Sequence, residues 1–419
     1  MGDTLAGTTR HRLVRMTGRD PGQSHRASTP LELLFDLAFV VAFGQAGDQF
    51  AHALAEGHTG AGVVAFVFAI VGTCWAWINF SWFASAYDTD DWFYRLTTMV
   101  QMSGVVVFAL GIPEFFASIE HGGHVGNVVL LVGYVIMRVA LIGQWLRAAH
   151  QDPARRRTAH WYVVLVGTAQ LGWIAITILD LDAVPFFAAS AVLFVLEFFG
   201  PVMAERKTAG TPWHPHHIAE RYGLLAIITF GEGVFGTVAA VSMLVEERGW
   251  SSEAVAIVVA GLGITFGLWW SYFIMPSGPV LERHRSRAFG WGYGHILIYG
   301  SIAATGSGLH LAAYLSEGHA VVGVPGAVSA VAIPVLVFSV SLFTLYTYLL
   351  QEFDPFHVAL FLGTVVTLVA SVLLAYAGAS LGLCLLVITA SPAVVVVGYE
   401  TIGHRHQADT LARVLAPVA

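Results

Sequence analysis

The sequence predicts an all-α membrane protein, a polytopic bundle of about twelve transmembrane helices. Of its 419 residues, 56% are hydrophobic and only 11% are charged, whereas soluble domains carry roughly 25% charged residues. The mean hydropathy is +0.71. Apolar runs of about 20 residues, the length that crosses a bilayer core, recur along the whole chain. This composition excludes an ordinary soluble enzyme, a nucleic-acid binder and a disordered scaffold.

Twelve apolar runs, separated by short polar connections, define the predicted spans. They lie near 31–54, 60–84, 92–117, 125–147, 159–180, 184–204, 217–244, 252–275, 288–315, 326–350, 356–377 and 379–399. Only Gly378, Ala379 and Ser380 separate the last two runs, so a count of ten or eleven spans stays open. Cys74 and Cys384 lie in different runs and predict neither a disulfide nor a thiolate metal site. No cofactor is expected, and no metal ligand set is assigned.

The distribution of basic residues predicts the orientation. The tail 1–30 is rich in arginine and has no apolar run, so it is not a cleaved signal peptide. With this tail inside, the even-numbered connections hold nearly all remaining basic residues, and the odd-numbered ones hold only Arg248. By the positive-inside rule, both termini are cytoplasmic, including the tail 400–419.

An internal repeat divides the chain into two halves, 31–204 and 217–399, joined by a cytoplasmic linker, 205–216. Residues 35–45 and 222–232 align without a gap. Three further matches follow in order: Trp75 and Trp77 with Trp269 and Trp270, Arg95 with Arg287, and Asp152-Pro153 with Asp354-Pro355. Six spans per half give both halves the same orientation, which predicts a pseudo-twofold axis along the membrane normal.

Polar residues inside the predicted spans are candidates for a transport path, because an ionisable group in the bilayer normally faces a partner or a water-filled cavity. Gln45 and Glu232 each lie about 21 Å from the inner end of their span, at 1.5 Å per residue. The candidate path residues are Asp36, Gln45, Asp48, Asn79, Gln101, Glu232 and His295. The alternative is that these groups form hydrogen bonds that fix helix packing.

Two further groups of charges have both a structural and a functional interpretation. Arg138 and Glu197 lie at equal depth in neighbouring spans, which predicts an ion pair that fixes packing or acts as a gate or proton relay. The cytoplasmic acidic cluster Asp88, Asp90 and Asp91 could hold a divalent cation. Asp90 and Asp91 also suit the N-terminal end of the third span, where carboxylates cap a helix.

The motifs resemble a known family. Glu32-Leu33-Leu34-Phe35-Asp36-Leu37-Ala38-Phe39-Val40 is similar to the opening signature of the bacterial low temperature requirement A (LtrA) proteins. The resemblance continues through residues 87–95 and 220–232, through Trp269-Trp270 with Tyr272-Phe273, and to His295. The family commonly has an acidic residue where this chain has Ile274. The resemblance implies a multi-span inner-membrane protein, linked by name to growth in the cold, without a settled biochemical activity.

Three functional hypotheses follow. The first is a transporter of a small solute or ion that uses intramembrane carboxylates, with Asp36 and Glu232 as the ion-contacting groups. The second is an ion channel, to which a fainter similarity points: Phe35-Asp36 resembles the first-helix motif of two-repeat lysosomal-type potassium channels. The third is a non-transporting membrane protein, either a lipid-acting enzyme or a partner-binding element; an enzyme is the less favoured interpretation. The expected partners are the lipid bilayer and a small solute or ion, without nucleic acid, and an oligomer stays open.

Overall fold

The computed structural model describes residues 13–20, 22–23, 26–316 and 318–416, apart from the side chains of residues 243, 247, 248 and 316. Residues 1–12, with Arg10 and Arg12 of the predicted tail, lie outside the described residues. Throughout those ranges the secondary structure is helical, without a strand, and one isolated bridge joins His124 and Asp182. The predicted all-α fold is confirmed.

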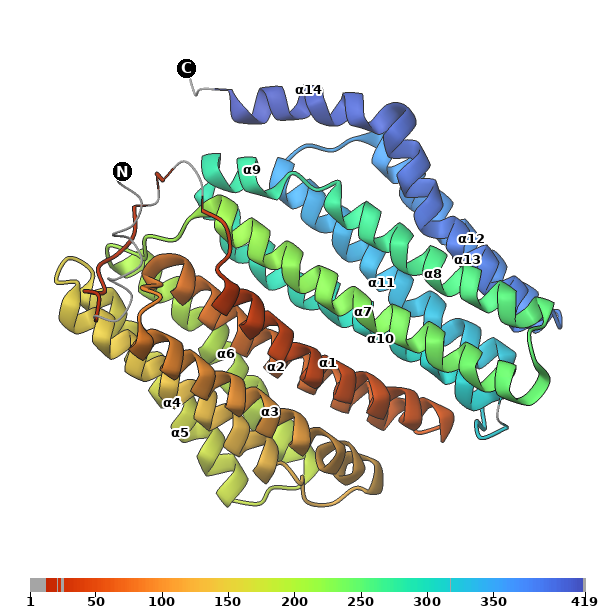
Figure 1. The fold of residues 1–419 in the computed structure, drawn as a ribbon, viewed down its shortest axis with the longest axis horizontal. Coiled ribbons are helices and arrows are strands. Elements are labelled where there is room, and N and C mark those ends of the chain that lie inside the picture. Colours follow the sequence, from red (N-terminus) through yellow and green to blue (C-terminus); the bar gives the residue numbers. More distant parts are fainter. Residues whose placement is uncertain (1–12, 21, 24–25, 317, 417–419) are drawn as a thin grey trace, which may run out of the picture. The chain divides into compact units, whose positions relative to one another are not determined.

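Twelve of the described helices are long and apolar enough to cross a membrane (Figure 1). They are α1 (Pro30–Ala55), α2 (Thr59–Tyr87), α3 (Trp92–His121), α4 (Val128–Gln151), α5 (Arg156–Ile178), α6 (Ala183–Lys207), α7 (Pro215–Arg248), α8 (Ser252–Phe273), α10 (Ala288–Ser316), α11 (Val324–Leu350), α12 (Pro355–Tyr376) and α13 (Leu381–Gly398). The predicted spans correspond to these helices one by one. The chain is therefore a multi-pass membrane protein; its orientation and its internal repeat stay predictions.

The helices form two compact units. The first comprises Met1–Gln45 and Gly72–Arg221, and the second comprises Ala46–Val71 and Tyr222–Ala419. In the first unit α3 packs on α4, α4 on α5 and α5 on α6. Gly133 lets α3 and α4 approach closely, because a Cβ atom there would lie 2.1 Å from the backbone nitrogen of Phe108.

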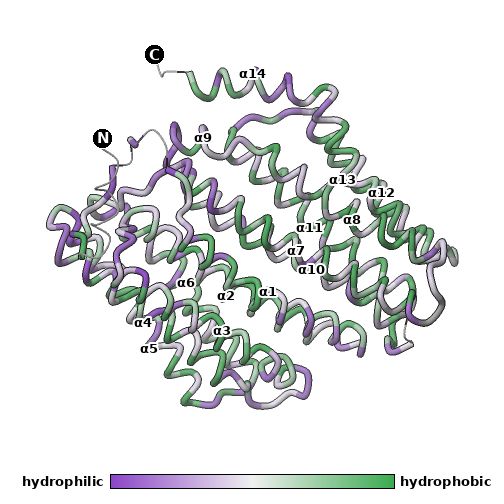
Figure 2. Tube along the Cα trace, viewed as in Figure 1, coloured by the Kyte–Doolittle hydropathy of each residue, from purple (hydrophilic) through white to green (hydrophobic). Residues whose placement is uncertain are grey.

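In the second unit α10 packs on α11, α8 on α13, and α12 on both α11 and α13. A turn separates α12 from α13. Gly378 in this turn has φ +86°, and the Ser380 side chain accepts a hydrogen bond from the backbone N–H of Leu383. The two final spans are thus separate helices. Figure 2 shows hydrophobic residues along the helices and hydrophilic residues gathered in connections and in the C-terminal helix.

Two helical elements were not foreseen. A short helix, α9 (Ser277–Arg283), follows α8. The predicted tail 400–419 instead continues as a π-helical turn, Tyr399–Gly403, and a helix, α14 (His404–Leu415). Gln407 Nε2 donates to the carbonyl of Ile274 at 2.8 Å, and Arg413 Nε donates to Glu352 Oε1 at 3.0 Å. These contacts hold α14 against other parts of the second unit, the end of α8 and the segment that follows α11.

The N-terminal segment, defined as the described residues from 13 to 29, lies against the ends of α2, α3 and α4. The backbone N–H of Val14 donates to Asp91 Oδ2 at 3.1 Å, that of Met16 to Gln151 Oε1 at 2.7 Å, and that of Gly18 to Asp152 Oδ2 at 3.2 Å. The Met16 side chain is fully buried. Part of the arginine-rich tail is therefore a folded component of the first unit.

Candidate functional site

A buried group of charges lies where α1 and α7 begin. Glu32 and Asp36 are one turn apart on α1, so both carboxylates lie on one face of the helix. Arg221 contacts both: its Nη1 lies 3.1 Å from Glu32 Oε1, and its Nε donates to Asp36 Oδ2 at 3.2 Å. Trp77 Nε1 from α2 donates to Asp36 Oδ1 at 2.6 Å. All three charged side chains are fully buried.

Two further basic side chains surround Glu32. His217, one turn before Arg221 on α7, places Nε2 3.1 Å from Glu32 Oε1. Arg26 of the N-terminal segment places Nη2 3.6 Å from the same oxygen. Arg26 also donates to the carbonyls of Ser85 and Ala84. We call Arg26, Glu32, Asp36, Asp88 and Arg221 the Arg221 cluster. Because Asp36 is held by a buried guanidinium, its ion pair must break before it can take up a proton or another cation.

A second site, in the other unit, surrounds Glu232 on α7. Glu232 lies 17 residues after Pro215, about 26 Å along the helix, near its middle. In the part of the chain that the structure describes, neither a hydrogen bond nor an ion pair reaches its carboxylate. Glu32, Asp36 and Glu197 each contact an arginine. Among the described residues, Glu232 is thus a carboxylate near the middle of a predicted span that has no arginine or lysine partner.

Small residues bring neighbouring helices close to Glu232. A Cβ atom on Gly306 of α10 would lie 2.7 Å from the Glu232 carbonyl oxygen, and one on Gly47 of α1 would lie 3.7 Å from Glu232 Oε2. Asp48, the residue after Gly47, places Oδ1 3.2 Å from His310 Nδ1 on α10. The Asp48 side chain is 57% exposed and that of His310 is 27% exposed. An accessible carboxylate–imidazole pair therefore lies beside the half-buried Glu232; we call Glu232, Asp48 and His310 the Glu232 site.

Three of the four other candidate path residues have local partners. Asn79 Nδ2 donates to the Trp75 carbonyl at 2.8 Å, and Gln101 Nε2 donates to Gln144 Oε1 at 2.9 Å. His295 is fully buried; its Nδ1 bonds to the Trp291 carbonyl at 2.8 Å, so Nε2 accepts from the Tyr272 hydroxyl at 3.0 Å. Gln45 is half-buried. Asp36, Gln45, Asn79 and Gln101 belong to the first unit, whereas Asp48, Glu232 and His295 belong to the second. That they line one path stays a prediction.

Arg138 and Glu197 contact each other. Arg138 Nη2 donates to Glu197 Oε2 at 3.0 Å. The Tyr134 hydroxyl and Trp173 Nε1 also donate to this carboxylate, both at 2.9 Å. Such a well-partnered buried pair is suited to fixing helix packing. Its role as a gate or relay stays a prediction.

The acidic cluster at the start of α3 is paired with arginines. Asp90 forms two 2.8 Å hydrogen bonds with Arg95. Asp91 Oδ1 accepts from the Tyr94 backbone N–H at 2.9 Å, so Asp91 caps α3. Burial opposes the Asp91 charge, but hydrogen bonds from Arg147 and from backbone N–H groups outweigh it and keep the pKa of Asp91 below its usual value. The three carboxylates hold separate arginine partners, since Asp88 lies 3.8 Å from both Arg19 and Arg26.

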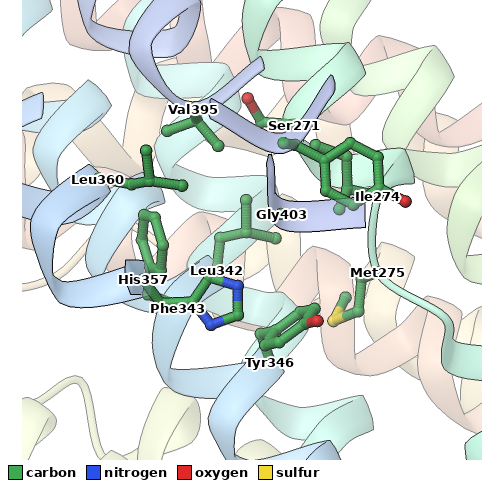
Figure 3. A pocket seen from close by; sticks show the side chains of 11 residues that line it. Ser271, Ile274, Met275, Leu342, Phe343, Tyr346, His357, Leu360, Val395 and Gly403 are labelled. Carbon is green, nitrogen blue, oxygen red and sulfur yellow. The ribbon is translucent and has the colours of Figure 1, made fainter. Parts of the chain in front are cut away.

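Ile274, where the resemblance leads us to expect an acidic residue, lines a small cavity of about 30 Å³ at the end of α8. Met275, Tyr346 and His357 lie around it (Figure 3). The lining is mostly apolar. No carboxylate from position 274 reaches this cavity, so any family role that depends on one is not available to this chain.

The sequence predicts the pair of Arg138 with Glu197, which the structure contains, but it does not reveal the partners of Glu32 and Asp36. The contacts of Arg221 with these two carboxylates and of His310 with Asp48 come from the structure alone. The available signal was the spacing of His217 and Arg221, four residues apart on one face of α7, as Glu32 and Asp36 are on α1. Matching these two pairs would have predicted the contact.

Comparisons with known proteins agree with the motif resemblance. The model of the family described as bacterial low temperature requirement A protein (LtrA) matches residues 27–392. A protein of Rhizobium meliloti (strain 1021), named uncharacterized protein RA0937, is 25% identical over 298 residues, which cover 68% of each chain. No solved structure matches. With twelve span-like helices and a family match over most of its length, the chain belongs to the bacterial low temperature requirement A family.

Proposed function

We propose that this protein transports a small cation, foremost the proton, across the bacterial inner membrane, and that Glu232 is the group that binds it. The observation that carries the proposal is the contrast among carboxylates at membrane depth. Glu32, Asp36 and Glu197 contact arginines, whereas Glu232 has no such partner among the described residues. A carboxylate inside the bilayer without a counter-charge is a functional group by default.

The surroundings of Glu232 suit exchange with the aqueous phase. Asp48 and His310 are the charged groups whose fields act on Glu232. Asp48 is exposed, and its Oδ1 lies 3.2 Å from Nδ1 of His310. We assign Asp48 and His310 to proton delivery and Glu232 to transient binding. In this proposal Asp36 has a structural role, through its ion pair with Arg221. The sequence-based hypothesis instead gives Asp36 and Glu232 the same ion-contacting role.

The test is cation flux in proteoliposomes that contain the purified protein and a pH-sensitive dye, under an imposed potassium-diffusion potential. Glu232→Gln removes the charge but keeps the shape, so we expect flux to fall at least about tenfold with unchanged folding. The matched control is Glu246→Gln on the same helix, where the side chain is exposed; its flux should equal that of the wild type. Wild-type flux in Glu232→Gln would refute the assignment.

The same assay separates the alternatives. A transporter gives flux that saturates with the gradient, whereas a channel gives single-channel currents in planar bilayers. If cation flux into the proteoliposomes is no faster than into empty liposomes, the result favours the non-transporting interpretation. Glu232 is then a packing residue next to Gly306.

A further inference from the structure

The Arg221 cluster contains polar atoms that lack hydrogen-bond partners within the described part of the chain. They include Asp88 Oδ2 and Arg26 Nε, and the hydroxyl of the neighbouring Tyr94 lacks one as well. Asp88 is 4% exposed, Arg26 6% and Tyr94 0%. Buried polar groups are normally satisfied, and an unsatisfied one usually indicates an unseen water, ion or proton. Arg26 contacts two of the buried carboxylates, because its Nη2 lies 3.8 Å from Asp88 Oδ2 and 3.6 Å from Glu32 Oε1.

The charges of the cluster do not balance when all its acids are ionised. Glu32, Asp36 and Asp88 are three buried carboxylates, while Arg26 and Arg221 are two buried guanidiniums. A third cation, Arg19, lies 3.8 Å from Asp88 but is 31% exposed, so solvent weakens its effect on Asp88 without removing it. An unpaired charge in a low-dielectric interior is costly. One proton on Asp88 leaves two carboxylates facing two guanidiniums.

We propose that the Arg221 cluster binds one exchangeable proton on Asp88, and that this proton stabilises the N-terminal segment in its docked position. The N-terminal segment covers Asp88. Arg19 of this segment donates through Nε to the Asp88 carbonyl at 3.1 Å, and Arg26 donates to the carbonyl of Ala84 at 2.8 Å. Releasing the segment would expose Asp88 to water. The site lies in the first unit and is independent of the proposed role of Glu232 in the second.

The electrostatic environment of Asp88 agrees with this assignment. Burial, and next the negative charge of Glu32, raise the pKa of Asp88 to about 6, against the opposing charges of Arg19 and Arg26. The charged and titratable groups that act on Asp88 come from three neighbouring elements: Arg19 and Arg26 from the N-terminal segment, Glu32 from α1, and Tyr94 and Arg95 from α3.

The sign of the pH dependence follows from linkage. When the segment is released, water solvates Asp88 and its pKa falls toward the ordinary 3.8. The docked state therefore binds the proton more tightly, and docking is strongest in acid and weakens as the pH rises through about 6. The difference between 3.8 and about 6 limits the effect on the docking equilibrium to about a hundredfold.

Hydrogen exchange of the full-length protein in lipid nanodiscs measures docking directly. The amides of Val14, Met16 and Gly18 are hydrogen-bonded only while the segment is docked. After correction for intrinsic exchange, we expect their protection to fall about tenfold between about pH 5 and about pH 8, because much of the full effect is already lost by pH 5. Asp88→Asn should keep high protection at every pH, since the amide carries no charge and can still accept from the Asp90 N–H.

The control is Asp90→Asn. Asp90 pairs with the exposed Arg95, and asparagine tolerates its positive φ of 48°, so this variant should titrate as the wild type does. Arg19→Gln gives a second test, because removing a nearby cation should move the midpoint to higher pH. Protection that does not change with pH in the wild type, or a wild-type pH curve in Asp88→Asn, would overturn the proposal. If Asp88→Asn does not fold, an unchanged or lower midpoint in Arg19→Gln overturns it.

Discussion

The ion pair between Asp36 and Arg221 is the interaction whose loss should cost the first unit most. Both side chains are fully buried, and Arg221 is shared between Asp36 and Glu32. Removing one partner of a buried pair leaves an uncompensated charge and destabilises a protein by about 3 to 5 kcal/mol. In Asp36→Asn, Arg221 keeps its contact with Glu32, so we expect a loss of stability at the lower end of this range. In Arg221→Met, both carboxylates lose their guanidinium partner, so we expect a loss at the upper end of the range or beyond it.

The double variant should be less unstable than the sum of the two single variants. With Asp36 and Arg221 both neutral, Glu32 keeps Arg26 at 3.6 Å and His217 at 3.1 Å. The coupling between the two substitutions should then reach about 2 to 3 kcal/mol, in the range that residues in contact show. Replacing both partners with uncharged groups is far less harmful than replacing one.

The assay is SDS-driven unfolding of the purified protein in bicelles, followed by tryptophan fluorescence, to which Trp77 beside Asp36 contributes. Asp48→Asn is the control, because its pair with His310 is largely exposed and exposed pairs contribute at most about 1 kcal/mol. Additive effects of the two substitutions, or a cost below about 1 kcal/mol for Asp36→Asn, would contradict the assignment of this pair to the stability of the first unit.

Two further substitutions test the close packing at Glu232 and the cap of α3. In Gly306→Ala, the new methyl group would lie 2.7 Å from the Glu232 carbonyl oxygen, so we expect a loss of about 1 to 3 kcal/mol from overpacking and reduced flux in the liposome assay; unchanged stability and flux would contradict the close approach. Asp91→Ala removes the acceptor for the Tyr94 N–H and the partner of Arg147. Losing such a cap costs about 0.5 to 2 kcal/mol, which the same unfolding titration measures, and a variant as stable as the wild type would show that solvent replaces both contacts.

The spans could be predicted because the lipid bilayer imposes one length and one polarity on every helix that crosses it. Even the difficult turn at Gly378 carried its own signal, a glycine followed by a capping serine. The helix α14 could not be predicted in this way. It is a polar helix, held by tertiary contacts such as those of Gln407 with Ile274 and Arg413 with Glu352, and sequence patterns do not reveal such contacts.

The site was predicted only in part, for a related reason. The cost of a charge in the membrane identifies Asp36, Glu197 and Glu232 from the sequence alone. It does not say which helix supplies the partner. Equal depth was enough to pair Arg138 with Glu197, because both lie well inside their spans. Arg221 lies close to the beginning of α7, where an arginine is also expected as a positive-inside residue, so its contact with Asp36 was hidden.

The distance in sequence between Asp36 and Arg221 also has a consequence for biogenesis. The two residues are 185 positions apart. At about 5 to 20 residues per second, a ribosome needs roughly 10 to 40 seconds between them. For that time the first helix emerges and enters the bilayer with Glu32 and Asp36 lacking the guanidinium that later neutralises them. The membrane insertion machinery must therefore accept α1 with two acidic residues in its first turns, and its final electrostatic environment is complete only once the seventh helix has been synthesised.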